Sequence, residues 1–267
     1  MIGYYFEAPT EEDSDMTEAL TAALPGLRTV SVGRTDDRYV VTLDRPDARN
    51  AIDAAMITEL HAVCAAIEAD PAPVLLTGAG DHFAGGADIG ELRDRGRDQA
   101  LAGINRTLFD RFAALPLPTV AAVSGYALGG GAELSYACDI RVATDTAVFG
   151  NPEPGLGILA AAGATYRLPA LVGQSVAKQV LLAGRTLDAA AALRCGLVMD
   201  VVPAGEHIAA AHRVIDRITA SSALALRLTK SIIDGTGRVE DIAQAVLFDT
   251  TDKQERMTAF LEKRNRR

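Results

Sequence analysis

Cysteine is scarce in this sequence, and the three that occur, Cys64, Cys138 and Cys195, lie far apart. An odd number of cysteines without CxxC spacing argues against a disulfide framework and a zinc site, and it favours reduced thiols in the cytoplasm. No apolar run approaches the roughly 18 residues of a membrane-spanning helix. The acidic N-terminus also lacks the basic start and apolar stretch of a signal peptide. We therefore expect a cytoplasmic protein with no membrane partner.

Positive charge is also in short supply. The chain has 26 Lys and Arg against 35 Asp and Glu, which gives a net charge of −9. A nucleic-acid-binding protein needs a basic face, so this balance argues against nucleic acid as a partner. The charges are unevenly placed, because residues 1–27 contain six acids and no base whereas residues 253–267 contain six bases and two acids. We expect residues 1–27 to form an acidic, partly disordered tail.

Two nucleotide-binding motifs are missing. Gly78 and Gly80 follow a short apolar run, as in a dinucleotide-binding turn, but Phe83 stands where that motif needs a third glycine. No GxxxxGK[ST] sequence occurs, which excludes a P-loop. The sequence therefore gives little support to nucleotide-dependent redox chemistry.

Strand and helix patterns alternate through the first three quarters of the chain. Alternating polar and apolar residues predict a hairpin over 28–46, and an apolar spacing of three and four predicts a helix over 50–70 that begins near Asp53. Thr186 is the expected N-cap of a later helix that ends at Gly196. Short apolar runs predict strands at 73–78, 118–125, 139–144 and 198–203, and the first two are expected to be buried.

The pattern becomes helical after Pro203. Helices are expected at 205–220, 223–234 and 240–263. The chain is thus expected to have a strand-and-helix core over residues 28–203 and a helical C-terminal region over residues 204–267.

Two glycine clusters each lead into a helix. Gly129–Gly131 follow a buried strand, and the first amides of the helix that they open have no intrahelical acceptor. Residues 85–88, with the sequence GGAD, have the same design. Two such entries that each direct one N–H group at the same oxygen would form an oxyanion hole. The alternative for residues 85–88 is a tight turn in which Asp88 caps the helix.

Two glutamates stand close to these clusters in the sequence. Glu133 falls in the first turn of a helix whose other residues are apolar, and the helix dipole favours an anion there. Glu153 lies between Pro152 and Pro154, which predicts an extended, stiff loop. Two carboxylates beside an oxyanion hole can move protons to and from a substrate held by its carbonyl group. The alternatives are an exposed helical glutamate and an exposed turn glutamate; a glycosidase pair would leave the glycine clusters without a role.

Several motifs together resemble the crotonase, or enoyl-CoA hydratase/isomerase, superfamily. They occur in family order between Thr29 and Arg264 as RPDARNAI, FAGGADIGEL, PTVAAVSGYALGGGAELSYACDIRVAT, FGNPEPGLG, RLPALVG and TAFLEKR. The resemblance implies an α/β (α+β) fold, a spiral of ββα units with a helical C-terminal trimerisation region. It also implies a homotrimer or a dimer of trimers.

The resemblance places roles on individual residues. The oxyanion amides fall on Ala87 and Gly130, and the two catalytic glutamates fall on Glu133 and Glu153. Asp139 matches an aspartate that we interpret as structural or as supporting the site. The positions expected to bind the acyl-CoA substrate are Ala48 and Arg49 near the adenine, then Ala84, Gly85, Gly86, Asp88 and Ala161, and finally Phe260 and Lys263 near the CoA moiety, across subunits or within one.

The implied activity is that of an enoyl-CoA hydratase, with coenzyme A as part of the substrate and no metal or other cofactor. Two alternatives stay open, namely a Δ3–Δ2 enoyl-CoA isomerase that uses Glu153 as its main base and a non-catalytic acyl-CoA-binding protein. The chain departs from the family pattern after Glu153, where Ala160, Ala161, Ala164 and Tyr166 replace Pro, Gly, Gly and Gln. These changes leave the acyl specificity open.

The basic C-terminus generates one prediction. If Lys263 contacts a phosphate of coenzyme A, Lys263→Ala will raise KM for a full CoA thioester and leave kcat unchanged, because a remote contact is equally strong in the ground and transition states. Steady-state kinetics at low and high salt check this, since added salt screens an exposed charge and should shrink the effect.

A pantetheine thioester without the nucleotide phosphates is the control substrate, and its KM should not respond to the substitution. An unchanged KM for the full thioester at low salt would leave Lys263 with only the ordinary role of a cation near a helix C-terminus.

Overall fold

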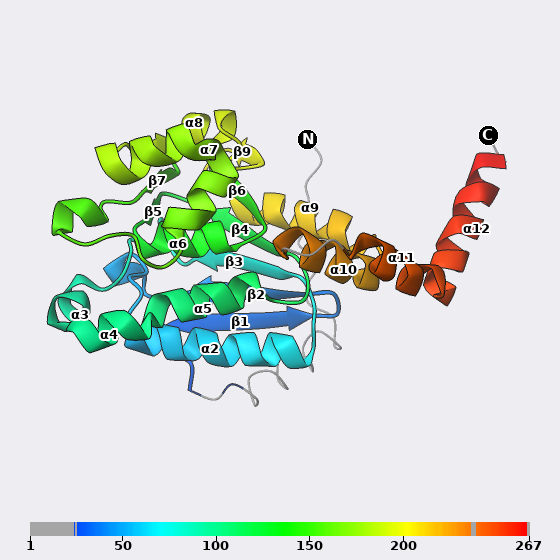
Figure 1. Cartoon of the computed structure of the whole chain (residues 1–267), viewed down its shortest axis with the longest axis horizontal. Helices are drawn as coiled ribbons and strands as arrows, with labels where there is room; N and C mark the ends of the chain where they lie inside the picture. Colours follow the sequence, from blue (N-terminus) through cyan, green and yellow to red (C-terminus); the bar gives the residue numbers. More distant parts are fainter. Residues whose placement is uncertain (1–23, 25, 236–238, 266–267) are drawn as a thin grey trace.

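The structure is a computed structural model of the chain, and it describes residues 24, 26–235 and 239–265. The predicted hairpin is confirmed, since β1 (Val30–Thr35) pairs antiparallel with β2 (Arg38–Leu43). The two strands form one edge of a larger sheet and lead directly into the parallel part of the fold (Figure 1).

Six strands form the main sheet, in the order β1-β2-β3-β4-β6-β9. The four predicted strands are all present, as β3 (Val74–Gly78), β4 (Thr119–Val123), β6 (Ile140–Thr144) and β9 (Asp200–Val202). From β2 onward, neighbouring strands are parallel. A parallel sheet covered on both faces needs apolar residues at nearly every position, which explains the continuous apolar run of β4.

Helices cover both faces of this sheet. On one face, Leu75, Val120 and Val142 pack against Ala211 and Ile215 of α9 (His207–Thr219). The main core lies on the other face. It includes side chains of α2 (Ala54–Ala69), α5 (Ile104–Ala113) and α6 (Gly130–Ala137). Every residue of α6 is buried, so any polar group on this helix lies in the interior of the protein.

A second, three-stranded sheet joins the two stretches of chain that carry the glutamates. Its strands are β5 (Tyr126–Leu128), β7 (Val148–Gly150) and β8 (Leu187–Asp188). β5 runs into α6, and β7 ends three residues before Glu153. β5 and β7 are parallel neighbours, and the Gly129 N–H extends the pairing by donating to the Gly150 carbonyl at 2.8 Å. This small sheet therefore brings the start of α6 beside the loop of Glu153.

Shorter helices fill the connections. They are η1 (Pro46–Ala48), α3 (Ile89–Asp94), α4 (Arg97–Ala102), η2 (Glu153–Leu156) and α8 (Ala189–Arg194). The longest helix, α7 (Ala164–Ala183), is kinked at Gly173, whose φ of +76° is not helical. The predicted helix start near Asp53 is confirmed, and the structure adds that Asp53 caps α2, with Oδ1 accepting a hydrogen bond from the Met56 N–H at 2.8 Å.

Three local predictions are wrong. Thr186 does not cap α8. Leu187 and Asp188 first pair with β7, so the helix begins later. Asp188 is the cap, and its Oδ1 accepts a hydrogen bond from the Ala191 N–H at 2.7 Å. Glu153 is not in an extended loop but begins the 3-10 helix η2, since a proline at the start of a helix loses no hydrogen bond.

The third error concerns the last predicted helix, 240–263, which is broken in two. α11 (Glu240–Phe248) and α12 (Thr251–Asn265) are separate. Thr250 Oγ1 donates to the Leu247 carbonyl at 2.7 Å and accepts from the Lys253 N–H at 3.3 Å, so one threonine closes the first helix and opens the second.

The C-terminal helices form an arm. α10 (Ala223–Asp234) follows α9, and α11 and α12 extend away from the sheets (Figure 1). At the other end, the predicted acidic tail falls mostly outside the described residues; of residues 1–27, Leu24, Gly26 and Leu27 are described, and Leu24 is buried in the main core. Within the described residues, no helix is both long and apolar enough to span a membrane.

Asn50 yields a prediction about stability. This fully buried residue lies at a φ of +55°, and its Nδ2 donates to the carbonyls of Ala79 and His82 at 2.9 and 2.7 Å. Asn50→Ala leaves both carbonyls without that donor and removes a residue type that tolerates positive φ. We expect the free energy of unfolding to fall by about 3 kcal/mol.

Denaturant titration at one protein concentration measures the loss. The control is Thr58→Ala, which removes an exposed hydroxyl from α2 and should change stability by less than about 0.5 kcal/mol. Equal unfolding midpoints for the two variants would show that Asn50 does not hold these loops together.

Candidate active site

Two helix entries meet beside the small sheet. The Leu128 N–H donates to the Ala84 carbonyl at 3.0 Å, so the chain before α3 runs along β5. A methyl group built on Gly130 would lie 3.5 Å from the Ala87 nitrogen, and one built on Gly86 would lie 3.9 Å from the Gly130 nitrogen. Within the described part of the chain, neither the Ala87 nor the Gly130 N–H donates to a protein acceptor. Two adjacent free amides can stabilise negative charge on one oxygen.

Each of the three consecutive glycines has a close neighbour. Gly129 has a φ of +51°, and a Cβ there would lie 3.2 Å from Glu153 Oε1. A Cβ on Gly131 would lie only 2.3 Å from the Ala84 carbonyl oxygen. Any side chain at these two positions would push apart the helix entries or displace a carboxylate. Gly130 lies between them, and its lack of a side chain keeps the space beside the Ala87 and Gly130 N–H groups open.

Glu133 is not an exposed helical glutamate. Its residue surface is only 3% exposed, and Oε1 accepts hydrogen bonds from the Ala162 and Ala164 N–H groups at 2.8 and 3.0 Å. Burial, helped by the charge of the nearby Glu153, raises the pKa of this carboxyl to about 7. The two amides and the Arg167 guanidinium oppose this rise, because they favour the ionised form.

Glu153 is not an exposed turn residue either, since it is 8% exposed. Asn151 lies close by, with Nδ2 3.5 Å from Glu153 Oε1, and Asn151 Oδ1 accepts from the Tyr136 hydroxyl at 3.2 Å. Glu153 Oε2 is buried and has no hydrogen-bond partner among the described residues. Burial raises the pKa of this carboxyl too. One oxygen of Glu153 is therefore available to a bound molecule.

The two carboxyl groups form an electrostatically coupled pair. Both are buried and both have a raised pKa, and the charge of Glu153 makes it harder for Glu133 to ionise. With a pKa of about 7 at Glu133, such a pair can hold a proton near neutral pH. It can thus take a proton at one carboxyl and give a proton from the other.

The predicted substrate-binding residues around the first glycine cluster lie together. Gly85 N–H donates to the Arg49 carbonyl at 2.8 Å, which places the exposed turn at Ala48 and Arg49 next to Gly85. Asp88 caps α3, with Oδ1 accepting from the Gly90 and Glu91 N–H groups. The cap proposed for Asp88 and the oxyanion geometry are thus compatible features of the same turn.

Four other predicted residues are placed differently. Ala161 is exposed, and the amides that reach Glu133 come from the residues that follow it. Phe260 and Lys263 lie on α12, whose exposed side chains are on the projecting arm, and the structure does not bring them to the glutamates (Figure 1). Asp139 touches neither glutamate, since its Oδ2 accepts from Thr119 and from Lys230 Nζ.

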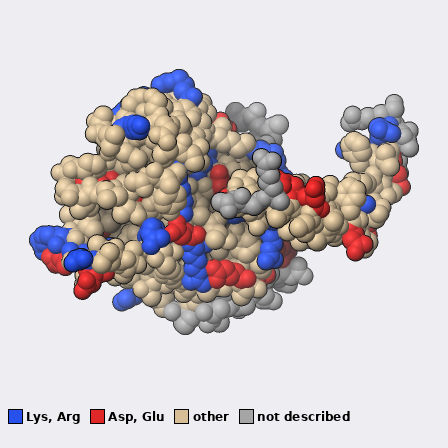
Figure 2. Space-filling view, viewed as in Figure 1, with Lys and Arg blue, Asp and Glu red and all other residues tan. Residues whose placement is uncertain are grey.

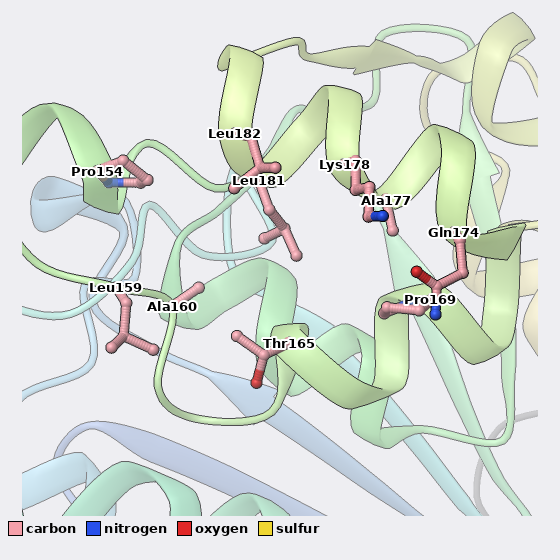
Figure 3. Close-up of a pocket in the computed structure, with 10 residues that line it drawn as sticks. All are labelled: Pro154, Leu159, Ala160, Thr165, Pro169, Gln174, Ala177, Lys178, Leu181 and Leu182. Atoms are coloured by element: carbon pink, nitrogen blue, oxygen red, sulfur yellow. The ribbon is translucent and has the colours of Figure 1, made fainter.

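A cavity of about 330 Å³ separates part of the glutamate-bearing loop from the second half of α7. Figure 3 shows its walls, formed by Pro154, Leu159 and Ala160 of the loop and by Ala177, Lys178 and Leu181 of α7. The loop between Glu153 and α7 is therefore loosely packed on this side. Its position depends on contacts on the side of α5 and α6.

Those contacts come from residues that the sequence reasoning did not select, namely Asn151, Tyr136, Arg167 and Asp110. Arg167 Nη2 donates to Asp110 Oδ1 at 2.7 Å, which links α7 to α5. Asn151 could have been noticed because it lies two residues before Glu153. The link between Arg167 and Asp110 spans 57 residues, and no local pattern in the sequence signals it. In the described chain, no three His, Cys, Asp or Glu residues are grouped as a metal site.

Comparison with known proteins supplies independent information. Residues 37–267 match the family described as enoyl-CoA hydratase/isomerase. The chain is 37% identical to a probable enoyl-CoA hydratase of Mycobacterium tuberculosis over 88% of this chain and 96% of that protein. It is 40% identical to a short-chain-enoyl-CoA hydratase of Clostridium acetobutylicum, over 84% and 91%. The crystal structure of an enoyl-CoA hydratase from Bacillus anthracis superposes with a TM-score of 0.84 at 34% identity, covering 88% of this chain and 97% of that one.

The raised pKa of Glu133 predicts a pH effect on stability. The carboxyl has a pKa of about 7 when folded and about 4.5 when unfolded. Between these values the unfolded chain releases the proton while the folded chain retains it, so raising the pH destabilises the protein, by on the order of 2–3 kcal/mol. Glu133→Gln removes this loss, and denaturation at several pH values should show the variant gaining stability relative to wild type as the pH rises.

The test compares how the free energy of unfolding changes with pH in the two proteins, because the glutamine substitution also changes stability by an amount that does not depend on pH. Glu206→Gln, an exposed change at the start of α9, is the matched control and should run parallel to wild type. Parallel curves for Glu133→Gln as well would contradict a raised pKa.

Proposed function

The chain belongs to the enoyl-CoA hydratase/isomerase family, and from that premise we propose that it is an enoyl-CoA hydratase. It catalyses the reversible addition of water across the 2,3 double bond of an enoyl-CoA thioester. The observation that carries the proposal is the pairing of two buried carboxyls of raised pKa with two adjacent free amides. Relatives named as enoyl-CoA hydratases, at 37–40% identity over most of both chains, support the same activity.

The oxyanion hole acts on the thioester. The N–H groups of Ala87 and Gly130 donate to the thioester oxygen and draw electron density from the conjugated double bond, which makes Cβ electrophilic. As water adds, negative charge moves to this oxygen and an enolate forms. Donors that are already in place cost no reorganisation at that moment, so they stabilise the enolate more than the substrate.

The glutamates handle the water and the protons. A water bound between the carboxyl groups loses a proton to one of them while its oxygen bonds to Cβ. The other carboxyl gives its proton to Cα, and the enolate collapses to the thioester. One proton enters the pair and one leaves it, so the pair again holds one proton, and transfer of that proton from the base to the acid restores the starting state. The free Oε2 of Glu153 supports the binding of this water, whereas Glu133 Oε1 is already held by two amides. These groups supply every proton that the reaction needs, so we propose no metal or redox cofactor.

The proposal extends to a homotrimer or a dimer of trimers. Large apolar side chains are exposed in two regions: near the Glu153 loop and α7 (Leu156 57%, Leu159 62%, Leu182 76%) and on the arm (Ile242 68%, Phe248 52%, Phe260 67%). In Figure 2 the surface over α7 and α8 is largely uncharged. Exposed apolar surface of this kind is typical of subunit contacts. A partner arm that docks there would also explain why Phe260 and Lys263 lie far from the glutamates of their own chain. A cytoplasmic location is supported by three free thiols.

An isomerase is the second candidate, because it needs only one base and Glu153 has a free oxygen. The burial and hydrogen bonding of Glu133 favour the hydratase, since a group without a catalytic role gains nothing from a costly buried charge. The two activities are distinguished by substrate: a hydratase consumes the conjugated 2-enoyl thioester, and an isomerase converts the 3-enoyl thioester into it.

Glutamine variants test the proposed function. Glu133→Gln and Glu153→Gln keep the shape of the side chain but remove proton transfer, so each should lower kcat by about a hundredfold or more. The substrate Kd should change little, because the oxyanion amides remain. The measurement is the loss of the conjugated thioester absorbance over a panel of enoyl-CoA esters of different chain length.

Glu206→Gln is the control and should match wild type. Near-normal hydration by either active-site variant would disprove the two-acid mechanism. If water addition is absent in the wild type, while a 3-enoyl thioester is consumed and only Glu153 matters, the protein is an isomerase.

A further inference from the structure

The peptide units that hold Glu133 belong to a loop with little support of its own. Ala162 and Ala164 donate to Glu133 Oε1 from the turn that opens α7. The residue between them, Gly163, has a φ of +132°, which only glycine adopts readily. The cavity in Figure 3 lies between the chain just before this turn and one side of α7, from Thr165 to Leu182. Something on the other side must fix the direction of these two amides.

Arg167 lies there and contacts this turn at three points. Its backbone N–H donates to the Gly163 carbonyl at 2.8 Å, and Nη1 donates to the Ala162 carbonyl at 3.3 Å. A Cβ built on Gly163 would lie 2.1 Å from Nη1, so the guanidinium fills the space that a side chain would occupy. The Arg167 side chain is only 14% exposed. Residue Ala162 is thus held on both sides, because its carbonyl accepts from Arg167 and its N–H donates to Glu133.

Asp110 in turn fixes the guanidinium. Its Oδ1 accepts from Arg167 Nη2 at 2.7 Å and also from the Tyr166 hydroxyl, and the guanidinium stacks on the Tyr166 ring at 4.8 Å. The pKa of Asp110 is lowered overall; partial burial alone would raise it, but the hydrogen bonds from Tyr166 and Arg167 favour its charged form. The carboxylate therefore remains a fixed partner for the arginine near neutral pH.

We propose that Arg167, held by Asp110 and Tyr166, is a positioning residue that directs the Ala162 and Ala164 amides at Glu133 and so sets its orientation and its proton affinity. Arg167 touches neither reacting atom nor substrate in this scheme and acts through the turn. The inference rests on the proposed hydratase function, because Glu133 is one of the two acids of that mechanism.

The charges around Glu133 decide the direction of the effect. Glu153 on η2 faces Glu133 and raises the pKa of Glu133, whereas Arg167 on α7 lowers it. Tyr136 on α6 is uncharged, since burial raises the pKa of its hydroxyl far above physiological pH. Asp110 on α5 lies behind Arg167. Removing Arg167 takes away a cation and loosens two amide hydrogen bonds, and each of these losses favours the protonated carboxyl.

Arg167→Met is therefore expected to lower kcat by roughly tenfold to a hundredfold, the size expected for weakened hydrogen bonds to a charged group. KM should change little. Both limbs of the kcat–pH profile should move to higher pH, whichever glutamate is the base, because the pair as a whole holds its proton more tightly. Arg167→Lys keeps the positive charge but lacks the planar guanidinium with its two N–H groups. Its kcat–pH profile should therefore lie near that of wild type, while kcat stays reduced.

A second readout does not need turnover. Infrared difference spectra of the Glu133 carboxyl, assigned by its loss in Glu133→Gln, should show ionisation at higher pH in Arg167→Met than in wild type. If the wild type hydrates no enoyl thioester, the proposed function fails while this titration still tests the positioning role. If Arg167→Met does not fold, the milder variant Tyr166→Phe replaces it in the test. This variant removes only a hydroxyl from a half-exposed ring, and kcat should fall by roughly twofold to fivefold.

Arg106→Met is the matched control. Arg106 also pairs with Asp110, through Oδ2 at 3.3 Å, but makes no contact with the α7 turn, so kcat and pH profile should match wild type. The proposal is overturned if folded Arg167→Met keeps kcat within about twofold and an unchanged Glu133 titration. It is also overturned if Arg106→Met reproduces the pH shift, which would show a general effect of charge.

Discussion

A hydrogen bond from the Leu128 N–H to the Ala84 carbonyl brings two helix entries together, and the candidate site depends on that contact. It sets the chain before α3 against β5, so that the free amides of Ala87 and Gly130 lie side by side. Glycine at 131 permits this approach, because a Cβ there would strike the Ala84 carbonyl. The strand pairing thus places two helix N-termini next to each other, and adjacent amides of this kind can share one oxygen.

The glutamates show how a fold accommodates buried acid. Burying a carboxylate is costly, and the cost is met differently at the two positions. Glu133 receives two backbone hydrogen bonds on one oxygen, whereas one oxygen of Glu153 has no hydrogen-bond partner within residues 26–235 and 239–265. The first arrangement fixes a group in place, and the second leaves an acceptor for a bound molecule. Since each carboxyl has a raised pKa, the pair retains a proton near neutral pH, as acid–base chemistry on a weakly acidic carbon requires.

The local parts of this account could be predicted from the sequence, and the distant contacts could not. The hairpin, the four parallel strands and the helix that begins near Asp53 follow from patterns within a few residues, and the structure confirms them. Errors arose where a partner far away or a single side chain decided the outcome. Pairing of Leu187 with β7 moved a helix start to Asp188, and the Thr250 hydroxyl divided the last helix. The site showed the same limit: the glycines and glutamates stand out in the sequence, but Arg167 gains its role only through Asp110, on another helix.

The central claim is that two backbone amides polarise a thioester carbonyl beside the glutamate pair. The most direct measurement is the infrared carbonyl stretch of a 13C-labelled, unreactive enoyl-CoA analogue, free in solution and bound to the protein. Two N–H donors on the oxygen weaken the C=O bond, so the stretch should move to a lower wavenumber on binding. The shift should persist in Glu133→Gln and Glu153→Gln, because it comes from the backbone of Ala87 and Gly130. A bound analogue whose carbonyl stretch equals that in water, or shifts upward as in an apolar pocket, would contradict the account.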